Sequence, residues 1–436
     1  MGRTLFDSLI IGSPKRKKGL LSKQAEFFPY YAGFPENFAT AIIETSGLPA
    51  NGIVFDPWNG SGTTTTAAAQ LGYDAYGTDL NPVMVIVALA RNLSDVEAKN
   101  LLGQADFFVE ELTHDSNIDF SEDPLLQWFT IESTELIRNL EYKIRKKFLP
   151  NAIKGIVSYG QEMPREAAAL YVALFITCRL FTKPFKSTNP TWLRLPKEAE
   201  PKIKTDVKEL TDEFLRHVRN IASSVQIAQG LSRTPYIDVS VSDTTNSLRR
   251  NFADLVLTSP PYCTRIDYTA ATRIELALIE PLLVTSRETL SRSMIGSIKV
   301  PLSVIEPKSE WGKSCLEFLE KLTAHGSKAS KGYYFKTHLD YFDKLFRSLA
   351  NISGSLKDDG QAIFVVQDSY YKEIHNNLPC ILSEMAAGIG LCLYRRENFV
   401  QNNSISQINS GSSKYRRAGQ TVESVICFKK EKEQLK

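Results

Sequence analysis

The feature that most limits the possible folds is an alternation of short apolar strands with helices near the N-terminus. Ile53–Asp56 reads as a strand, and a turn with two glycines separates it from a helix at 63–71. A second strand, Asp74–Asp79, and a second helix, Pro82–Arg91, follow. Alternation of this kind predicts a parallel sheet with helices on both faces, so we expect an α/β protein.

The rest of the chain divides into an insertion and a second group of strands. Residues 95–235 carry mainly helical patterns, including a helix at 166–181 whose longest apolar run, ten residues, is too short for a membrane span. We expect three regions: 1–94 as the first part of the sheet domain, 95–235 as the insertion, and 236–436 as the second part, in which 286–332 is polar and irregular. The other elements that we expect are helices at 34–44, 270–283, 333–351 and 372–387, and strands at 236–241, 254–258, 361–367, 390–400 and 421–428.

Composition narrows the class of protein. Hydrophobic residues make up 43% and charged residues 23%, which is typical of a soluble globular chain. The six cysteines are scattered, without a C-x-x-C pair or histidines at ligand spacing, so we expect reduced thiols and no metal. No apolar run near the N-terminus has the length of a signal-peptide core, and we expect a cytoplasmic protein without membrane association.

Charge is distributed unevenly, although the net charge is only +3. Residues 101–137 contain nine acids and no base, and we interpret them as a solvated connector. Residues 138–219 contain 17 bases and 9 acids, with aromatic residues between the bases. Such a surface can bind phosphates and stack on nucleobases, although a solvated helical face is the alternative interpretation. Its candidate DNA contacts are Arg145, Lys146, Lys147, Lys183 and Lys186.

The turn after the first strand, D-P-W-N-G-S-G-T at 56–63, is the first candidate binding site. Its glycines allow the backbone to approach a ligand closely. It lacks the G-K-[S/T] ending of a phosphate-binding loop, so a triphosphate is not expected. Asp79 ends the next strand, where a carboxylate can accept hydrogen bonds from both hydroxyls of a ribose. The turn alone is also compatible with an ordinary strand-turn-helix, but together with Asp79 it predicts a nucleoside cofactor.

The second candidate site is T-S-P-P-Y at 258–262, directly after another strand. Consecutive prolines stiffen a loop at the carboxyl end of that strand, the edge where doubly wound sheets place their chemistry. Ser259 offers a hydroxyl, Pro260 a carbonyl and Tyr262 a flat ring. An amino group on a planar base can donate to the first two while the base stacks on the third. A proline-stiffened turn without chemistry is the alternative interpretation.

In sequence order, the D-P-W-N-G-S-G-T turn, Asp79 and T-S-P-P-Y resemble the S-adenosylmethionine-dependent DNA amino-methyltransferases, which modify cytosine N4 or adenine N6. The resemblance covers roughly residues 27–92 and 236–428 and leaves out the insertion. It implies a doubly wound, seven-stranded, Rossmann-like methyltransferase sheet with an antiparallel last strand. Trp58 stands where the family usually has Phe, which preserves a hydrophobic contact with the cofactor.

The resemblance assigns one half of the site to S-adenosylmethionine. Asp79 would hold the ribose, and Asp243 would meet the adenine amine, although capping of the following turn is the alternative for Asp243. Phe28-Pro29 with Phe34-Pro35 resembles the segment that closes over the methionine end. The implied cofactor-binding residues are Phe28, Pro29, Asp56, Pro57, Trp58, Gly60, Ser61, Gly62, Thr63, Asp79 and Asp243.

The implied catalytic residues are Ser259, Pro260, Pro261 and Tyr262. If Ser259 and the Pro260 carbonyl accept the two amine hydrogens of a flipped base, the nitrogen lone pair can attack a methyl group in line without a covalent intermediate. Attack at cytosine C5 through a cysteine is rejected, because Tyr262 separates Pro261 from Cys263. Serine before the prolines favours cytosine N4 in this family, and adenine N6 is the alternative.

The expected partner is double-stranded DNA, and a restriction endonuclease or a defence-system protein is a further candidate. We expect the insertion to contact phosphates, with 286–332 as a second candidate for target recognition. Arg265, Arg416 and Arg417 are additional expected DNA contacts. The alternatives are an RNA methyltransferase and a non-catalytic DNA-binding subunit. The second alternative leaves Asp79, Ser259 and Tyr262 unexplained.

Overall fold

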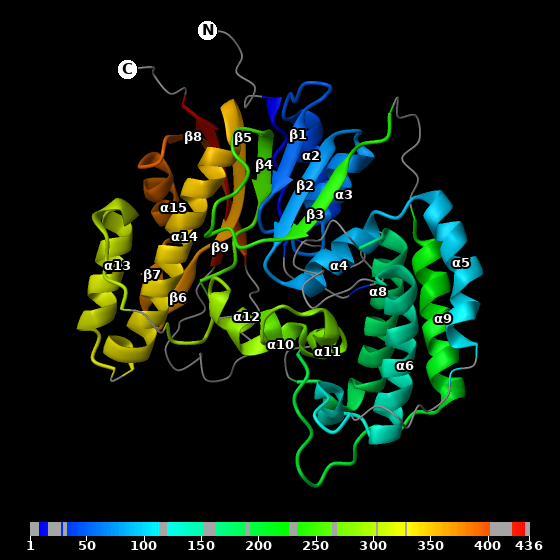
Figure 1. The fold of residues 1–436 in the computed structure, drawn as a ribbon. Coiled ribbons are helices and arrows are strands. Elements are labelled where there is room, and N and C mark those ends of the chain that lie inside the picture. The colour runs from blue at the N-terminus through cyan, green and yellow to red at the C-terminus, as the bar shows by residue number, and fades with distance from the viewer. Residues whose placement is uncertain are drawn as a thin grey trace.

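A seven-stranded sheet forms the centre of the molecule, with strand order β3-β2-β1-β4-β5-β9-β8 (Figure 1). The computed structural model describes residues 8–15, 28, 33–110, 112, 120–150, 163–187, 192–225, 233–263, 268–301, 304–327, 329–401 and 421–431. The strands of the sheet are β1 (Ile53–Asp56), β2 (Asp74–Asp79), β3 (Ile237–Val241), β4 (Ala253–Thr258), β5 (Leu356–Gln367), β8 (Leu391–Gln401) and β9 (Thr421–Lys430).

The strand directions confirm the expected doubly wound sheet. β1 pairs in parallel with β2 and β4, β2 with β3, and β4 with β5. β9 runs antiparallel to both of its neighbours, β5 and β8. Between β1 and β4 the winding reverses direction, and Phe55 pairs with Val256 near the carboxyl ends of these two strands. A crevice at such a switch point is the usual ligand site of an open α/β sheet.

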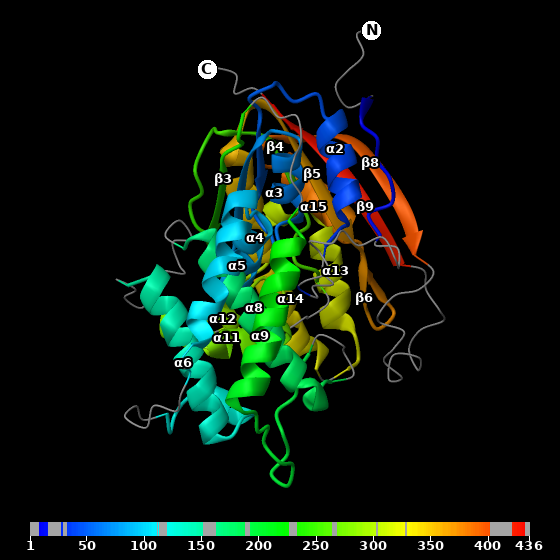
Figure 2. The same ribbon diagram turned by 90° about the vertical axis from the view of Figure 1, so that its right-hand side faces the viewer.

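Helices cover both faces of the sheet (Figures 1 and 2). One face carries α2 (Glu36–Thr45) and α3 (Thr63–Gln70), and the other carries α13 (Lys313–Ala324), α14 (Phe335–Ser355) and α15 (Leu378–Ala387). Successive strand residues point to opposite faces, so Val54 packs with the first group and Phe55 with the second. Leu255 and Val256 repeat this alternation on β4.

The insertion folds as a helical bundle beside the sheet, as expected (Figures 1 and 2). Its helices are α5 (Asp95–Val109), α6 (Ile131–Phe148), α8 (Arg165–Phe181) and α9 (Val207–Ser223). α8 is largely buried because it packs against α4 (Pro82–Arg91), α6 and α9. Ser94, Thr130 and Asp206 cap the N-termini of α5, α6 and α9. The acidic stretch expected as a connector is partly helical, because α5 ends and α6 begins within it.

Three elements of the C-terminal part differ from the sequence expectations. Residues 286–332 are not irregular throughout, because they contain α12 (Arg287–Ser293) and α13. The helix expected at 372–387 begins only at Leu378, because Asn377 caps it and the preceding residues form a hairpin. The hairpin strands are β6 (Ser369–Tyr371) and β7 (Ile374–Asn376). The helix expected at 270–283 is divided into α10 (Tyr268–Ala271), α11 (Arg273–Leu278) and a 3-10 turn that contains Pro281.

All six cysteines are free thiols, as the sequence predicted. Within the described ranges, no three or more His, Cys, Asp or Glu side chains gather in a way that can hold a metal ion. No described helix combines the length and the apolar character that a membrane span requires.

Candidate active site

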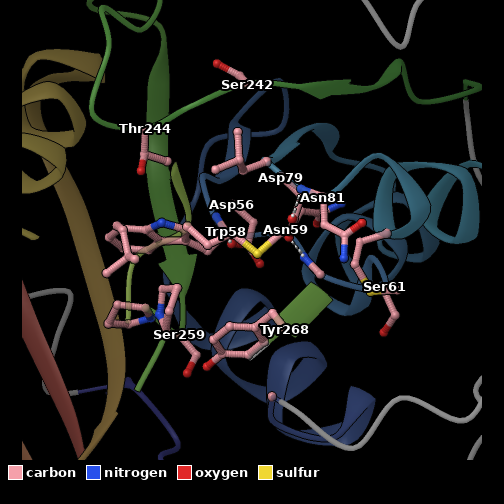
Figure 3. Close-up of a pocket in the computed structure, with 18 of the residues that line it drawn as sticks. Asp56, Trp58, Asn59, Ser61, Asp79, Asn81, Ser242, Thr244, Ser259 and Tyr268 are labelled. Atoms are coloured by element: carbon pink, nitrogen blue, oxygen red, sulfur yellow. Dashed lines mark hydrogen bonds between the residues drawn. The ribbon is translucent and has the colours of Figure 1, made fainter. Parts of the chain in front are cut away.

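A pocket opens at the carboxyl edge of the sheet, where the loops after β1, β2, β3 and β4 meet (Figure 3). It encloses about 1010 Å³, including its open mouth. Trp58 and Tyr262 line the same pocket, although the whole insertion separates them in the sequence. The two predicted half-sites therefore converge. The predicted site residues that line the pocket are Asp56, Trp58, Gly60, Ser61, Thr63, Asp79, Asp243, Ser259, Pro260, Pro261 and Tyr262.

Asp56 connects the two loops that carry the pocket. It is 3% exposed, and its Oδ2 accepts a hydrogen bond from Thr64 Oγ1 at 2.6 Å. Its Oδ1 accepts from the Trp58 backbone N–H and from Thr258 Oγ1, at the end of β4. Burial raises the pKa of Asp56 to about 6, although these hydrogen bonds lower it. Because both oxygens are engaged within the protein, the geometry gives Asp56 a positioning role between the loops.

Asp79 lies at the carboxyl end of β2 and supports the turns on both sides of it (Figure 3). Its Oδ2 accepts from the Gly60 backbone N–H at 2.9 Å, and its Oδ1 accepts from the Asn81 N–H at 2.8 Å. Burial raises the pKa of Asp79 to about 6 against these two bonds. Each carboxylate oxygen can accept a second hydrogen bond, so the side chain can still receive ligand hydroxyls.

Two residues of the glycine turn have packing requirements that shape the pocket. Gly62 has a φ of 85°, and a Cβ there would lie 2.8 Å from the Cβ of Ala88, so glycine is required. Asn59, which the sequence did not indicate, lines the pocket and is 4% exposed. Its Oδ1 accepts from Thr65 Oγ1, whereas its Nδ2 has no hydrogen-bond partner among the described residues. A buried donor without a partner in a pocket wall fits a ligand that supplies an acceptor.

Arg91, at the end of α4, anchors the glycine turn. Its Nη1 donates to the Ser61 carbonyl at 2.9 Å, and its Nη2 lies 3.3 Å from the Glu36 carboxylate. Glu36 directly follows Phe34-Pro35, so this ion pair holds the aromatic and proline segment beside the turn, and Phe34 lines the pocket. An arginine at a helix C-terminus and an acid at a helix N-terminus are common in any helix, which is why the sequence did not single them out.

The T-S-P-P-Y loop is held at defined points and leaves two acceptors open. Tyr341 Oη donates to the Pro261 carbonyl at 2.9 Å, and the Tyr262 N–H donates to Tyr268 Oη at 3.1 Å. The Ser259 hydroxyl and the Pro260 carbonyl have no hydrogen-bond partner in the part of the chain that the structure describes. Ser259 and Tyr268 both line the pocket (Figure 3). The loop can therefore accept two hydrogens from a ligand.

Cys263 follows this loop and is buried. Burial raises the pKa of its thiol far above the ordinary value, although a hydrogen bond from Asn376 opposes the shift. A thiol in this environment is not ionised at neutral pH and is a poor nucleophile. This agrees with the rejection of a cysteine-dependent attack.

Asp243 caps the following turn and also lines the pocket. Its Oδ1 accepts from the Thr245 N–H at 2.8 Å and from Thr245 Oγ1 at 2.7 Å, so it does cap the following turn. It also lines the pocket, and its Oδ2 has no partner among the described residues. The contact with the adenine amine stays a prediction.

The segment Ser293 to Ile295 supplies a wall of the pocket that the sequence placed only loosely. Gly296 follows with a φ of 78°, and a Cβ there would lie 2.9 Å from the Tyr262 carbonyl. Lys344 Nζ donates to the Arg292 carbonyl at 2.8 Å and holds the segment from α14. The wall belongs to 286–332, the second candidate for target recognition. No described residue of the insertion lines the pocket.

Several predicted cofactor residues lie outside the pocket lining. Phe28 is 4% exposed and packs against Phe175 of α8, with 6.5 Å between ring centroids. Pro57 and Gly62 belong to the turn but are not among the lining residues. The residues Pro29, Arg265, Arg416 and Arg417 lie outside the described ranges.

The predicted DNA contacts of the insertion differ in how accessible their charge is. Arg145 Nε lies 2.9 Å from Glu141, whose side chain is 1% exposed, so this charge is compensated. The exposed Lys146 and Lys147 rest over aromatic rings. Lys183 and Lys186 are exposed as well. Other ion pairs neutralise further bases of the insertion, so the accessible positive charge is smaller than the sequence count suggests. The arginines in those pairs are Arg138, Arg165, Arg179, Arg194 and Arg216.

The chain is similar to DNA methylases and to Type II methyltransferases. Residues 4–89 match the N6_N4_Mtase family model, described as DNA methylase, which covers the glycine turn and Asp79 but not T-S-P-P-Y. The chain is 23% identical to the Type II methyltransferase M.AvaI of a Nostoc species, over 84% of this chain and 79% of that protein. It is 25% identical to the Type II methyltransferase M.BsoBI of Geobacillus stearothermophilus, over 57% of this chain and 51% of that protein.

Likeness to solved structures is low. A TehB-like SAM-dependent methyltransferase from Corynebacterium glutamicum gives a TM-score of 0.28 at 10% identity, over 90% of this chain and 87% of that chain. The order and the direction of the strands define the fold. The strand order, the antiparallel β9 and the pocket at the switch point are those that the sequence resemblance implied for a doubly wound α/β sheet. The sequence comparisons support a DNA methyltransferase of the N6/N4 kind, with S-adenosylmethionine as its cofactor.

Proposed function

We propose that the protein methylates the exocyclic N4 of cytosine in a specific double-stranded DNA sequence. The observation that carries this proposal is the pair of acceptors, the Ser259 hydroxyl and the Pro260 carbonyl, without partners among the described residues. They lie in the pocket that Asp79 and Trp58 also line. Both acceptors are therefore available to the amino group of a base that enters this pocket.

The glycine-turn half of the pocket fits the cofactor. S-adenosylmethionine, when bound, supplies an electrophilic methyl group on its sulfonium. Asp79 accepts the ribose hydroxyls, and the Asn59 amide donates to an acceptor of the same ligand. The open Oδ2 of Asp243 accepts from the adenine amine, and Trp58 packs against the ligand's apolar surface.

The T-S-P-P-Y half makes the target amine reactive. The lone pair of an exocyclic amine is delocalised into the base, so the amine is a poor nucleophile. Ser259 and the Pro260 carbonyl accept its two hydrogens and favour a tetrahedral nitrogen, whose lone pair then becomes available. Tyr262 stacks on the flipped base and offsets part of the few kcal/mol that flipping costs. These effects act through positioning and electrostatics and need no covalent intermediate.

Cytosine is favoured over adenine because the residue before the prolines is the small, neutral Ser259. Adenine N6 is the second candidate, since its amine also has two hydrogens to donate. Expression in a methylation-free host, followed by sequencing for N4-methylcytosine and N6-methyladenine, separates the two and gives the recognition sequence. Absence of both marks, with intact protein present, would contradict the proposal.

The DNA surface includes two parts of the chain. The wall at 293–295 lies directly beside the catalytic loop, which suits target recognition. The exposed lysines of the insertion, Lys146, Lys147, Lys183 and Lys186, contact phosphates. The Type II names of the relatives support a restriction-modification context, with an endonuclease of the same specificity as partner.

A further inference from the structure

Two arginines of the insertion, the buried Arg138 and the largely buried Arg179, bind the α10–α11 segment, whose Tyr268 lines the pocket. Arg138 on α6 donates from Nη1 to the Leu278 carbonyl at 2.6 Å and from Nη2 to the Ala277 carbonyl at 2.7 Å. These carbonyls belong to the C-terminal end of α11, where a helix leaves acceptors without partners. Asp123 holds the same guanidinium through Nε at 2.6 Å. The Arg138 side chain therefore caps the C-terminus of α11.

Arg179 on α8 binds the start of the same segment. Its Nη2 donates to the Ala271 carbonyl at 2.5 Å, and its Nε pairs with Glu275, whose side chain is fully buried. The guanidinium also lies over the ring of Phe28, 5.2 Å from the centroid. One residue thus joins α8, the α10–α11 segment and the aromatic segment that precedes the glycine turn. α11 packs against α8 of the bundle and against α10, whose Tyr268 lines the pocket.

From the α10–α11 junction, hydrogen bonds continue to the cofactor side of the pocket. Thr272 Oγ1 accepts from Asn81 Nδ2 at 2.9 Å. The backbone N–H of Asn81 donates to Asp79 Oδ1 at 2.8 Å. The carboxylate proposed to hold the ribose is therefore connected with the insertion through Asn81, Thr272 and Ala271.

A second branch reaches the catalytic loop. Thr272 Oγ1 lies 3.3 Å from the Tyr268 carbonyl, to which it donates. Tyr268 lines the pocket, and its Oη accepts the Tyr262 N–H at 3.1 Å. The α10–α11 segment is thus bonded to both halves of the site, and the insertion holds it from the other side.

We propose that the helical insertion is a positioning domain for the active site, in which Arg138 and Arg179 hold the α10–α11 segment so that the two halves of the pocket stay aligned. The inference rests on the proposed methyl transfer for its activity readout only. It gives the insertion a positioning role in addition to the phosphate contacts of its exposed lysines. A fixed α10–α11 segment matters because small misplacements of reacting groups cost up to about 100-fold in rate.

The test compares Arg179→Ala, Arg179→Lys and Glu275→Gln with a matched control, Arg194→Ala. Arg194 also forms an ion pair within the insertion, with Glu200, but does not contact α11. Hydrogen exchange of residues 268–282 is followed in the protein without cofactor or DNA, and cofactor affinity is measured by calorimetry. Single-turnover methyl transfer is then measured on DNA that contains the recognition sequence.

The inference predicts faster exchange at 268–282 and a roughly 10- to 100-fold lower single-turnover rate in Arg179→Ala, with cofactor affinity changed less than about threefold. Arg194→Ala behaves like the wild type. Arg179→Lys, which keeps the charge but loses the second bond, lies between them. The inference is overturned if residues 268–282 of Arg179→Ala exchange as slowly as in the wild type. It is also overturned if the single-turnover rate of Arg179→Ala falls no more than that of Arg194→Ala.

Two further outcomes remain decisive. If Arg179→Ala does not fold, Arg179→Lys and Glu275→Gln replace it, and wild-type exchange in both overturns the inference. If the wild-type protein methylates no DNA, the proposed function fails, and the exchange data alone decide whether the insertion positions the segment.

Discussion

Replacement of Asp79 by asparagine should weaken cofactor binding. It should also make the unfolding free energy of the variant rise relative to that of the wild type as the pH increases. Burial raises the pKa of Asp79 to about 6, compared with 3.8 for an unperturbed carboxyl group. The folded state therefore binds the proton more tightly than the unfolded state, and wild-type stability falls as pH rises through this interval. The asparagine side chain does not titrate, so the variant lacks this loss.

The two pKa values set the size of the effect. Proton binding to Asp79 contributes about 1.4 kcal/mol to wild-type stability at pH 5 and almost nothing at pH 8. The difference in unfolding free energy between Asp79→Asn and the wild type should thus shift by about 1.4 kcal/mol in favour of the variant between pH 5 and pH 8. The altered hydrogen bonds to Gly60 and Asn81 also change the unfolding free energy of the variant, but by the same amount at every pH.

Urea unfolding at several pH values measures this shift, and Asp74→Asn is the matched control at the other end of β2. Burial raises the pKa of Asp74, but the hydrogen bond from Arg233 and the Tyr236 backbone N–H together lower it below the usual value. Asp74 stays ionised in the folded and the unfolded state between pH 5 and pH 8. Asp74→Asn should therefore be less stable than the wild type by the same free energy at every pH in this range. If the difference in unfolding free energy between Asp79→Asn and the wild type were also independent of pH, burial would not raise the pKa of Asp79.

Cofactor binding gives the second readout for Asp79. Loss of a charge-assisted hydrogen bond costs about 1.5–3 kcal/mol, so Asp79→Asn should bind S-adenosylmethionine about 10- to 100-fold more weakly at pH 8. Wild-type affinity should fall as the pH drops below about 6, where the carboxylate becomes protonated. Isothermal titration calorimetry measures both, and unchanged affinity in the variant would remove Asp79 from the cofactor site.

Three further predictions follow from the same contacts. Ser259→Ala should lower kcat by roughly 10- to 100-fold with little change in cofactor affinity, because one amine acceptor is lost; an unchanged single-turnover rate would contradict the mechanism. Tyr341→Phe should lower the free energy of unfolding by about 1–3 kcal/mol, because the Pro261 carbonyl loses its buried donor, and should also reduce kcat; unfolding in urea with steady-state kinetics checks both. Lys146→Ala combined with Lys147→Ala should reduce the slope of log DNA affinity against log salt by about 2, and an unchanged slope would show that these lysines do not contact phosphates.

The local elements around the site follow from the sequence because they depend on neighbouring residues. The bounds of β1, β2 and α4 agree with the structure, since an apolar run, a glycine turn and a capped helix are short-range patterns. The joining of Trp58 and Tyr262 in one pocket was predictable in outline, because parallel strands bring their carboxyl ends to one edge. Which proline carbonyl of the loop stays open to a ligand was not predictable from the sequence. Only the folded structure shows that the Pro261 carbonyl already accepts a hydrogen bond from Tyr341.

What the sequence determined by itself is the α/β alternation, the glycine turn and the two stretches that line the pocket. The tertiary structure alone decided how the basic insertion uses its charge, because Arg138 and Arg179 pair with carbonyls and a carboxylate more than 90 positions away. The same holds for the wall at 293–295 and for Asn59, whose contacts depend on packing between distant segments. Local patterns report short-range preferences, whereas the partner of a charged or polar side chain depends on which surfaces the folded chain brings together.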